Sequence, residues 1–316
     1  MNKYNGNLLV DKTAYLVLFM RSLYSKSDSL ASRFAQFLDV NEIMATHVLE
    51  HVRAKWPLAN FSMIADKTEE IRHGIYLLSP IIEVRTLVTQ ILAYALGFNH
   101  ICGLGAGLSP SLIEMAQQSN KIAFHTDLSM DVLKHLEVFI EGEFQGKIPC
   151  NLVLHPLDIL NKSKMRELCR ILRGYCVFFY TEGVLQYFNL GMKDQFFDAI
   201  TMVLSELPGS ILVTQDIRSK KDVQSILSLD ETARLVVELV AGMTGVKIIK
   251  NSYDSHRDAE DNILRGRNLK IQTLRPFDLI GDRVSELNSL NLPGIDAERT
   301  IERLKDRRIY VISSAK

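Results

Sequence analysis

Apolar residues along the chain recur with two different spacings, and the change between them falls near residue 97. Before that point they repeat every three or four residues, which is the spacing of one helix face. Four stretches have this spacing: Thr13–Tyr24, Ser32–Leu38, Glu42–Trp56 and Ile81–Leu96. Gly97 follows the last stretch and is typical of a residue that ends a helix. The first 97 residues therefore predict a helical cap packed against the rest of the chain.

From residue 101 onward, short apolar runs alternate with stretches of helical spacing. The short runs predict strands at Ile101–Leu104, Ile122–Thr126, Leu152–Leu154, Val177–Tyr180 and Ile211–Thr214. The stretches between them predict helices at Ser111–Gln118, Met130–Glu141, Lys164–Leu172 and Lys193–Leu207. Such alternation is typical of a parallel sheet with helices on both faces. The predicted class is therefore α/β.

The pattern is weaker after residue 216. It predicts a helix at Ser225–Ala241, strands at Val246–Ile249 and Tyr310–Ser313, and a polar loop at Asn251–Arg267. No internal repeat or clear linker divides the chain. We therefore predict one domain over residues 1–316. Residues 1–97 form the cap and a lead-in helix, 98–250 the α/β core, and 251–316 a C-terminal loop and terminal strand.

Composition and charge narrow the class of protein. Hydrophobic residues make up 47% of the chain and charged residues 23%, which is usual for a globular protein. Lys plus Arg and Asp plus Glu both number 37, so the net charge is zero and no nucleic-acid partner is indicated. No apolar run is long enough to span a membrane, and Ala14–Met20 is too short for a secretory signal. We expect a cytoplasmic protein with neither a nucleic-acid nor a membrane partner.

The four cysteines, Cys102, Cys150, Cys169 and Cys176, lack the spacing of a metal site. Three of them lie in or beside apolar runs. We therefore expect no metal, and reduced thiols that are mostly buried.

The candidate chemistry centres on residues 99–118, where a predicted strand runs through a glycine-rich turn into a helix. Gly105 and Gly107 lack Cβ atoms, so a ligand can touch the backbone there. Ser109 suits the N-cap of the helix and Pro110 its first position. The N–H groups of the first helical turn would then face the ligand. By itself this pattern also fits a plain tight turn.

Acidic residues follow the next predicted strands. Asp127 ends the second strand, twenty residues after Gly107, where an acid can accept hydrogen bonds from ribose hydroxyls. Asp158 follows the third strand and Glu182 the fourth. The carboxyl ends of parallel strands meet at one edge of the sheet, so these acids predict one ligand site. NAD enzymes and S-adenosylmethionine methyltransferases share this geometry, and the pattern does not choose between them.

Each of these candidates could instead have a purely structural role. Glu182 follows an apolar run directly, which favours a functional role. Asp158 could instead cap the following helix. His125 and His155 lie at strand ends, where either could line the pocket as a general base, although packing or surface positions suit them too. Tyr187 could orient a substrate or fill the core.

Six short motifs also occur in a characteristic order. They are Thr13, Ala14 and Arg21; VRT at Val84–Thr86; LGAGL at Leu104–Leu108; TDL at Thr126–Leu128; LDIL at Leu157–Leu160; and EGVLQYF at Glu182–Phe188. Together they resemble the leucine carboxyl methyltransferase family of S-adenosylmethionine-dependent enzymes. The resemblance is nearest to a bacterial branch of O-methyltransferases of polyketide-like metabolism, and it runs from about residue 11 to 205.

The resemblance implies a class I methyltransferase fold. This is a Rossmann-like sheet of seven strands, mostly parallel with the last antiparallel, behind an N-terminal helical cap. It also implies S-adenosylmethionine as cofactor and residues 98–250 as the cofactor-binding core. The partner would be a small-molecule methyl acceptor.

The resemblance further implies individual roles. The cofactor contacts would be Arg85 at the methionine carboxylate; Gly105, Ala106 and Gly107 beneath that moiety; Asp127 and Leu128 at the ribose; Asp158 and Ile159 at the adenine; and Glu182 near the amino group. Tyr187 is the candidate catalytic residue, because it could orient the substrate. Arg21 could reach the pocket from the cap and pair with an acidic substrate.

Three positions depart from the family's usual pattern. Ser109–Ser111 stands where the family has Asp-Thr-Arg, and Gln90 and His125 each stand where it often has an acid. A family member that binds a ligand without catalysis therefore stays open, as does a nucleotide-dependent oxidoreductase, although EGVLQYF has no role in hydride transfer. The predicted function is a methyltransferase that acts on a carboxylate or hydroxyl oxygen of a small molecule.

Overall fold

The computed structural model describes residues 7–24, 28–118, 121–146, 149–228, 230–280 and 307–315. Within these ranges one seven-stranded sheet forms, in the order β3-β2-β1-β4-β5-β7-β6. Its strands are β1 (His100–Leu104), β2 (Ile122–Asp127), β3 (Leu152–Pro156), β4 (Val177–Thr181), β5 (Ile211–Thr214), β6 (Leu269–Leu274) and β7 (Ile309–Ser314). β7 runs antiparallel to both β5 and β6, and the remaining pairs are parallel. The predicted class I sheet is confirmed.

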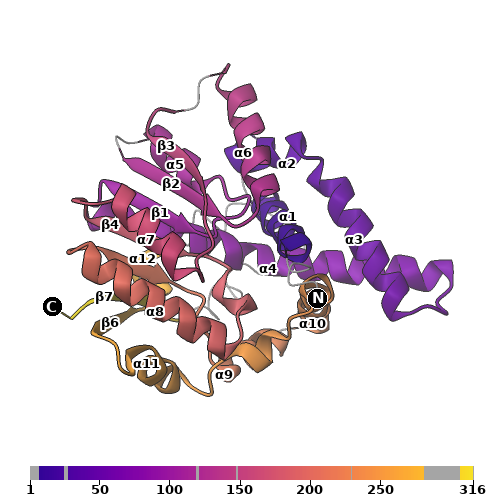
Figure 1. The fold of residues 1–316 in the computed structure, drawn as a ribbon. Helices are drawn as coiled ribbons and strands as arrows, with labels where there is room; N and C mark the ends of the chain where they lie inside the picture. The colour runs from indigo at the N-terminus through magenta and orange to yellow at the C-terminus, as the bar shows by residue number, and fades with distance from the viewer. Residues whose placement is uncertain are drawn as a thin grey trace.

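Helices cover both faces of this sheet (Figure 1). The N-terminal ones are α1 (Asn7–Tyr24), α2 (Leu30–Phe37), α3 (Val40–Lys55) and α4 (Phe61–Ala95). Those of the core are α5 (Ser111–Gln118), α6 (Met130–Glu143), α7 (Lys162–Ile171), the short 3-10 helix η1 (Leu185–Tyr187) and α8 (Leu190–Glu206). The C-terminal ones are α9 (Lys220–Leu227), α10 (Glu231–Thr244), the 3-10 helix η2 (Ile248–Asn251), α11 (His256–Leu264) and α12 (Pro276–Ile280).

Strand β4 shows how the two faces are filled. Its side chains alternate, so Phe178 and Tyr180 join one apolar cluster while Val177 and Phe179 join the other. The first cluster contains buried residues of α1–α6 and α10, and the second contains those of α7, α8 and α11. All five residues of β4 are buried. Burial on both faces explains why this strand reads as an unbroken apolar run.

The N-terminal cap is built on α4, which packs against α1, α3 and α10. Figure 1 shows the first half of α4 projecting from the body beside α3. In the described part of the chain, α4 is the one helix long and apolar enough to cross a membrane. Of the 18-residue apolar window within it, 56% is buried. A core helix has the same features, and the buried face of α4 includes Ile71, Ile75, Val84 and Val88.

The C-terminal region differs most from the sequence prediction. The strand predicted at Val246–Ile249 is wrong, because that stretch leads into η2. The predicted loop Asn251–Arg267 contains α11, whose buried positions are only Ala259 and Ile263. Such a narrow apolar stripe gives a weak helical signal. Strand β6 was not predicted because it lies at the sheet edge and exposes several polar side chains.

Two smaller expectations also change. The predicted helix Ser225–Ala241 is two helices, α9 and α10. Cys102 and Cys169 are buried, but Cys150 and Cys176 are exposed, so the expectation of mostly buried thiols is wrong for two of the four. Those two cysteines lie just outside strands, beside apolar runs rather than within them.

The parallel strands bring their carboxyl ends to one edge of the sheet. Leu104 pairs with Thr126, and Asp127 pairs with Pro156. Thr181 pairs with Thr214 on the other side. The loops that follow β1 to β5 therefore meet at this edge, which is where ligands bind in open α/β sheets.

Candidate functional site

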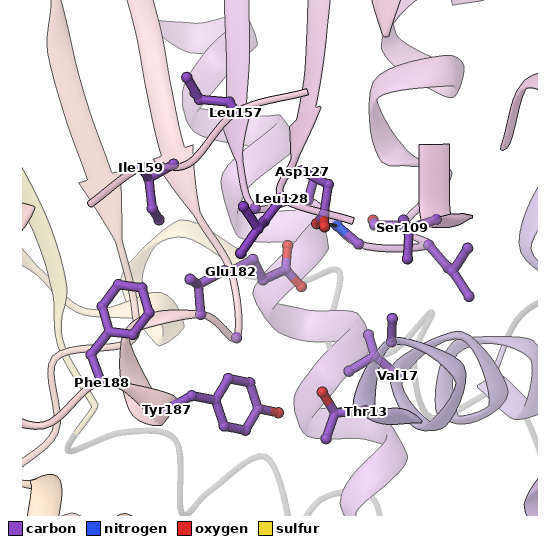
Figure 2. A pocket seen from close by; sticks show the side chains of 18 of the residues that line it. Thr13, Val17, Ser109, Asp127, Leu128, Leu157, Ile159, Glu182, Tyr187 and Phe188 are labelled. Carbon is purple, nitrogen blue, oxygen red and sulfur yellow. Dashed lines mark hydrogen bonds between the residues drawn. The ribbon is translucent and has the colours of Figure 1, made fainter. Parts of the chain in front are cut away.

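A cavity of about 270 Å³ lies at the carboxyl edge of the sheet (Figure 2). Its walls come from α1, from the loops after β1 to β4, and from η1. Nine of the predicted site residues line it: Gly105, Ala106, Gly107, Asp127, Leu128, Asp158, Ile159, Glu182 and Tyr187. Among the described residues, three carboxylates line this cavity and neither Lys nor Arg does. We call it the acidic cavity.

The glycine turn after β1 forms one wall of the acidic cavity. Gly105 and Gly107 have φ values of 67° and 58°, which favour glycine over residues with a Cβ atom. A Cβ atom on Gly105 would also lie 2.9 Å from Val184 Cγ2. Both glycines are therefore required by the turn itself.

Two backbone N–H groups of this turn are already bonded within the protein. Ala106 N–H donates to the Thr126 carbonyl at 2.8 Å, and Gly107 N–H donates to Asp127 Oδ2 at 2.9 Å. Helix α5 begins at Ser111, and none of its residues lines the cavity. The first turn of α5 therefore does not border the cavity, contrary to the expectation that its N–H groups face the ligand.

Asp127 both faces the acidic cavity and holds two loops. In addition to Gly107 N–H, its carboxylate accepts the Ser129 N–H at 2.9 Å through Oδ1. Burial raises the pKa of Asp127, while these N–H bonds act in the opposite direction. Each carboxylate oxygen keeps a second acceptor site, so a ligand hydroxyl can bind without displacing the loops.

Glu182 projects into the middle of the cavity from the end of β4 (Figure 2). Thr86 Oγ1 of α4 donates to its Oε1 at 2.7 Å. Burial raises the pKa of Glu182, and the charges of Arg85 and Arg21 oppose the shift. Thr86 belongs to the VRT motif, and its contact with Glu182 was not predicted.

The third carboxylate belongs to Asp158, which follows β3. Its Oδ1 accepts the Leu160 N–H at 3.0 Å, within the local turn. Helix α7 is capped by Asn161, whose side chain accepts from Ser163 and Lys164. The alternative that Asp158 caps this helix is therefore wrong. Ile159 is buried next to it in the chain, and Leu128, which also lines the cavity, is 49% exposed.

Arg85 does not line the acidic cavity. It is buried and donates from Nη2 to Asp216, the acid that follows β5. Asp216 also accepts N–H groups of Gly183 and Val184 at 2.8 Å and of Leu185 at 3.1 Å. Burial opposes ionisation, yet Arg85 and these N–H groups hold the pKa of Asp216 below its usual value. Arg85 thus supports the loop that carries Glu182 and Tyr187.

Asp216 was missed by the sequence analysis, although a signal existed. It follows the fifth predicted strand, just as Asp127, Asp158 and Glu182 follow earlier ones. The rule that flags acids at strand ends applies to it equally.

Arg21 also lies outside the lining of the cavity. It is buried in a polar network that includes two of the three positions where the chain departs from the family pattern, Ser109–Ser111 and Gln90. Its partners are Ser109 at 3.0 Å, Ser111 at 3.1 Å, Glu83 at 3.3 Å and Glu114 at 3.8 Å, and Gln90 donates to Glu114 at 3.0 Å. These bonds tie α1 to α4 and α5, and Arg21 lines neither this cavity nor the second one described below.

Neither histidine candidate lines the cavity. His125 Nε2 lies 2.8 Å from the Gly107 carbonyl, which can only accept, so Nε2 carries the proton. Burial lowers the pKa of His125 to about 4, against the effect of that bond. His155 is half-buried on β3 and also stands outside the lining. Of the two alternatives for these histidines, the structure therefore supports packing for His125, and it places neither side chain in the lining of the cavity.

Tyr187 stands between the acidic cavity and a second one of about 90 Å³. Thr13, Val17 and Tyr187 line both. Figure 2 shows the Tyr187 hydroxyl directed towards Thr13. The second cavity is lined by Arg85, Arg218 and Arg307 and, within the described ranges, by no acidic residue. We call it the basic cavity.

Comparison with known proteins supports the fold. No family model and no curated protein matches the chain. A candidate methyltransferase from Thermobifida fusca has a TM-score of 0.52 at 14% identity, over 85% of this chain and 94% of that one. An S-adenosylmethionine-dependent methyltransferase from Anabaena variabilis has a TM-score of 0.46 at 11% identity, over 73% and 84%. The first similarity shows a methyltransferase-like fold.

Proposed function

We propose that the protein is an S-adenosylmethionine-dependent methyltransferase that transfers the methyl group to an oxygen atom of a small molecule. The observation that carries this proposal is the charge of the acidic cavity. Asp127, Asp158 and Glu182 line it without a cationic side chain among the described residues. Such a site attracts the sulfonium and ammonium groups of this cofactor.

The same cavity is unsuited to a nucleotide that carries a pyrophosphate. Dinucleotides bind through free N–H groups at a glycine turn and helix N-terminus. Here the turn N–H groups of Ala106 and Gly107 are bonded internally, and α5 does not line the cavity. A pyrophosphate would instead meet three carboxylates. This disfavours the oxidoreductase alternative.

The residues suggest how the cofactor would lie. Asp127 can accept both ribose hydroxyls while it holds Gly107 and Ser129. Ile159 and Leu157 supply apolar walls for the adenine, with Asp158 beside them. Glu182, anchored by Thr86, can accept the ammonium group of the methionine moiety. Arg85, which the family resemblance assigns to the carboxylate, acts in this proposal through Asp216.

The bound cofactor supplies an activated methyl group on sulfur, and the protein supplies proximity and orientation. Tyr187 lies between the two cavities, so it can orient an acceptor that enters from the basic side. Burial raises the pKa of Tyr187, while hydrogen bonds with Thr13 and Gln186 oppose the shift. The hydroxyl therefore stays protonated near neutral pH and can donate.

Calorimetric titration with S-adenosylhomocysteine, S-adenosylmethionine and NAD tests the proposal. We expect heat from the first two and none from NAD. Asp127→Asn should weaken S-adenosylhomocysteine binding about tenfold to a hundredfold, since bonds to a charged acceptor contribute roughly 1.5–3 kcal/mol.

Asp131→Asn is the matched control, because Asp131 is exposed on the first turn of α6. Binding of NAD alone would overturn the proposal, as would equal S-adenosylhomocysteine affinity in Asp127→Asn and Asp131→Asn.

A further inference from the structure

The basic cavity has no part in the cofactor contacts described above. Arg85, Arg218 and Arg307 line it together with Gln186 and Tyr187. The rest of its lining is apolar apart from Thr13, and comes mainly from α1, α4, α9 and α10. Ile81, Ile226 and Val236 are buried members of this lining. The cavity therefore combines an apolar body with a cluster of guanidinium groups.

The positive charge of this cluster is only partly neutralised. Arg85 is paired with Asp216, but its Nε is buried without a hydrogen-bond partner. Arg218 Nε is buried without a partner as well. In the part of the chain that the structure describes, the side chains of Arg218 and Arg307 form no ion pair.

The nearby acids are already engaged. Asp216 is bound by Arg85 and three backbone N–H groups. Asp222 is 3.2 Å from His256 Nε2 and accepts the Ser219 N–H at 2.7 Å. Burial and the charge of Arg85 lower the pKa of Arg218 to about 10. A buried cation without a partner is unfavourable, so an anion in this cavity would be stabilised.

We propose that the basic cavity binds the methyl acceptor, and that this acceptor is an apolar monocarboxylic acid. Its carboxylate would lie against Arg218 and Arg307, and its chain among the apolar side chains of α4 and α10. A guanidinium binds a carboxylate with two parallel hydrogen bonds, which suits Arg218 to this role. The inference rests on the proposed methyltransferase function.

The position of Arg218 also suits the reaction. Arg218 lines the basic cavity together with Tyr187, which also lines the acidic cavity, so a carboxylate bound at Arg218 would lie on the side that faces the cofactor. A carboxylate oxygen would form the new O–CH₃ bond with its lone pair as the S–CH₃ bond breaks. The bonding electrons pass to sulfur, the sulfonium becomes a neutral thioether, and the acid becomes a neutral ester. No proton has to move.

Octanoate and 1-octanol are matched probes for this proposal, since they share a chain and differ in charge. Calorimetry of the full chain, saturated with S-adenosylhomocysteine, should show octanoate bound and 1-octanol bound more weakly. Arg218→Met should weaken octanoate about tenfold or more and leave 1-octanol unchanged. Arg218→Lys should lie between. Arg234→Met is the control, because Arg234 is exposed on the outer face of α10.

A second variant keeps the guanidinium groups intact. Val240→Phe fills the apolar part of the cavity and should weaken octanoate about fivefold or more, because burial of several methylene groups is lost. Equal octanoate binding in wild type, Arg218→Met and Val240→Phe would overturn the proposal.

The outcomes separate this inference from the proposed function. Loss of S-adenosylhomocysteine affinity in Arg218→Met would assign Arg218 to the cofactor's carboxylate and overturn the acceptor site. Octanoate binding that depends on Arg218, in a protein that binds no S-adenosylhomocysteine, would support the acid site and reject the methyltransferase. Octanoate and 1-octanol binding with equal affinity would reject the acid site alone.

Discussion

The two cavities at the carboxyl edge of the sheet share a wall and carry opposite charge. The acidic cavity is lined by three carboxylates, and the basic cavity by three guanidinium groups. Thr13, Val17 and Tyr187 lie between them. One edge of one sheet therefore carries two adjoining cavities whose linings favour ligands of opposite charge. In our proposal, the acidic cavity binds the cationic groups of the cofactor and the basic cavity binds an anionic acceptor.

Charge separation at this edge depends on a buried ion pair. The Asp216 carboxylate neutralises the charge of the buried Arg85 guanidinium. It also accepts three backbone N–H groups and so fixes the loop that carries Glu182 and Tyr187. The same pair therefore supports both cavities. Its removal should have a larger effect than any change confined to one cavity.

Asp216→Asn removes the carboxylate that supports both cavities. It leaves the Arg85 guanidinium buried without its counter-charge, so we expect the free energy of unfolding to fall by about 3–5 kcal/mol. Chemical denaturation followed by circular dichroism measures this. Asp254→Asn, which removes one partner of an exposed pair with Lys220, should change stability by less than about 1 kcal/mol. A loss of less than about 1 kcal/mol in Asp216→Asn would contradict the role given to the Arg85–Asp216 pair.

His125 supports the acidic cavity through its hydrogen bond to the Gly107 carbonyl, and burial keeps its imidazole neutral. The unfolded histidine takes up a proton below about pH 6.5, but the folded one only below about pH 4. The unfolded state therefore binds more protons between these values. Stability should fall as the pH drops through this window, by up to about 3 kcal/mol.

His125→Gln removes the titrating group but keeps a donor that can reach the Gly107 carbonyl. Its unfolding free energy should change less than that of wild type between about pH 6.5 and pH 4. If the unfolding free energies of the two proteins changed equally with pH, the pKa of His125 would not be lowered in the folded state, and the prediction would be wrong.

Gly105→Ala tests whether the turn that walls the acidic cavity needs its left-handed backbone. The Cβ atom would meet Val184 at 2.9 Å, at a φ of 67°. We expect a loss of about 1–3 kcal/mol in stability and weaker S-adenosylhomocysteine binding, with octanoate affinity little changed.

Gly142→Ala is the control for this change, because nothing lies within 4 Å of the added atom. It should be neutral or stabilising by up to about 1 kcal/mol. Thermal unfolding compares the two variants. Equal stability would mean that the turn adopts another conformation.

The smallest expected effect is on the pH dependence of turnover. No histidine of the described chain lines either cavity, and a carboxylate is already ionised above about pH 5. Methyl transfer to an acid should therefore stay flat from about pH 6 to 8. A rate that climbs through this range would favour a hydroxyl acceptor with a base.

The sequence was sufficient for the parts of the site that depend on local pattern. Gly105 and Asp127 stand where a strand, a turn and a second strand require them, so their meeting in one cavity could be predicted. The Arg85–Asp216 pair could not, because its members are 131 residues apart and nothing local links them. The basic cavity was missed for the same reason.

Alternation along a strand does not by itself decide which side chains line the cavity. His125 lies two residues before Asp127 on β2, on the same face of the sheet, yet it bonds the Gly107 carbonyl and does not line the cavity. The edge strand β6 has too few buried positions to be recognised as an apolar run. In both cases the decisive information is which neighbour the side chain meets.

The most direct test of two separate, oppositely charged sites is a titration of octanoate into the protein with and without saturating S-adenosylhomocysteine. We expect octanoate to bind at one molecule per chain in both cases, with an affinity that is unchanged or higher when S-adenosylhomocysteine is present. Mutual exclusion of the two ligands, with octanoate binding lost at saturation, would show that they share one site and would contradict the division into an acidic and a basic cavity.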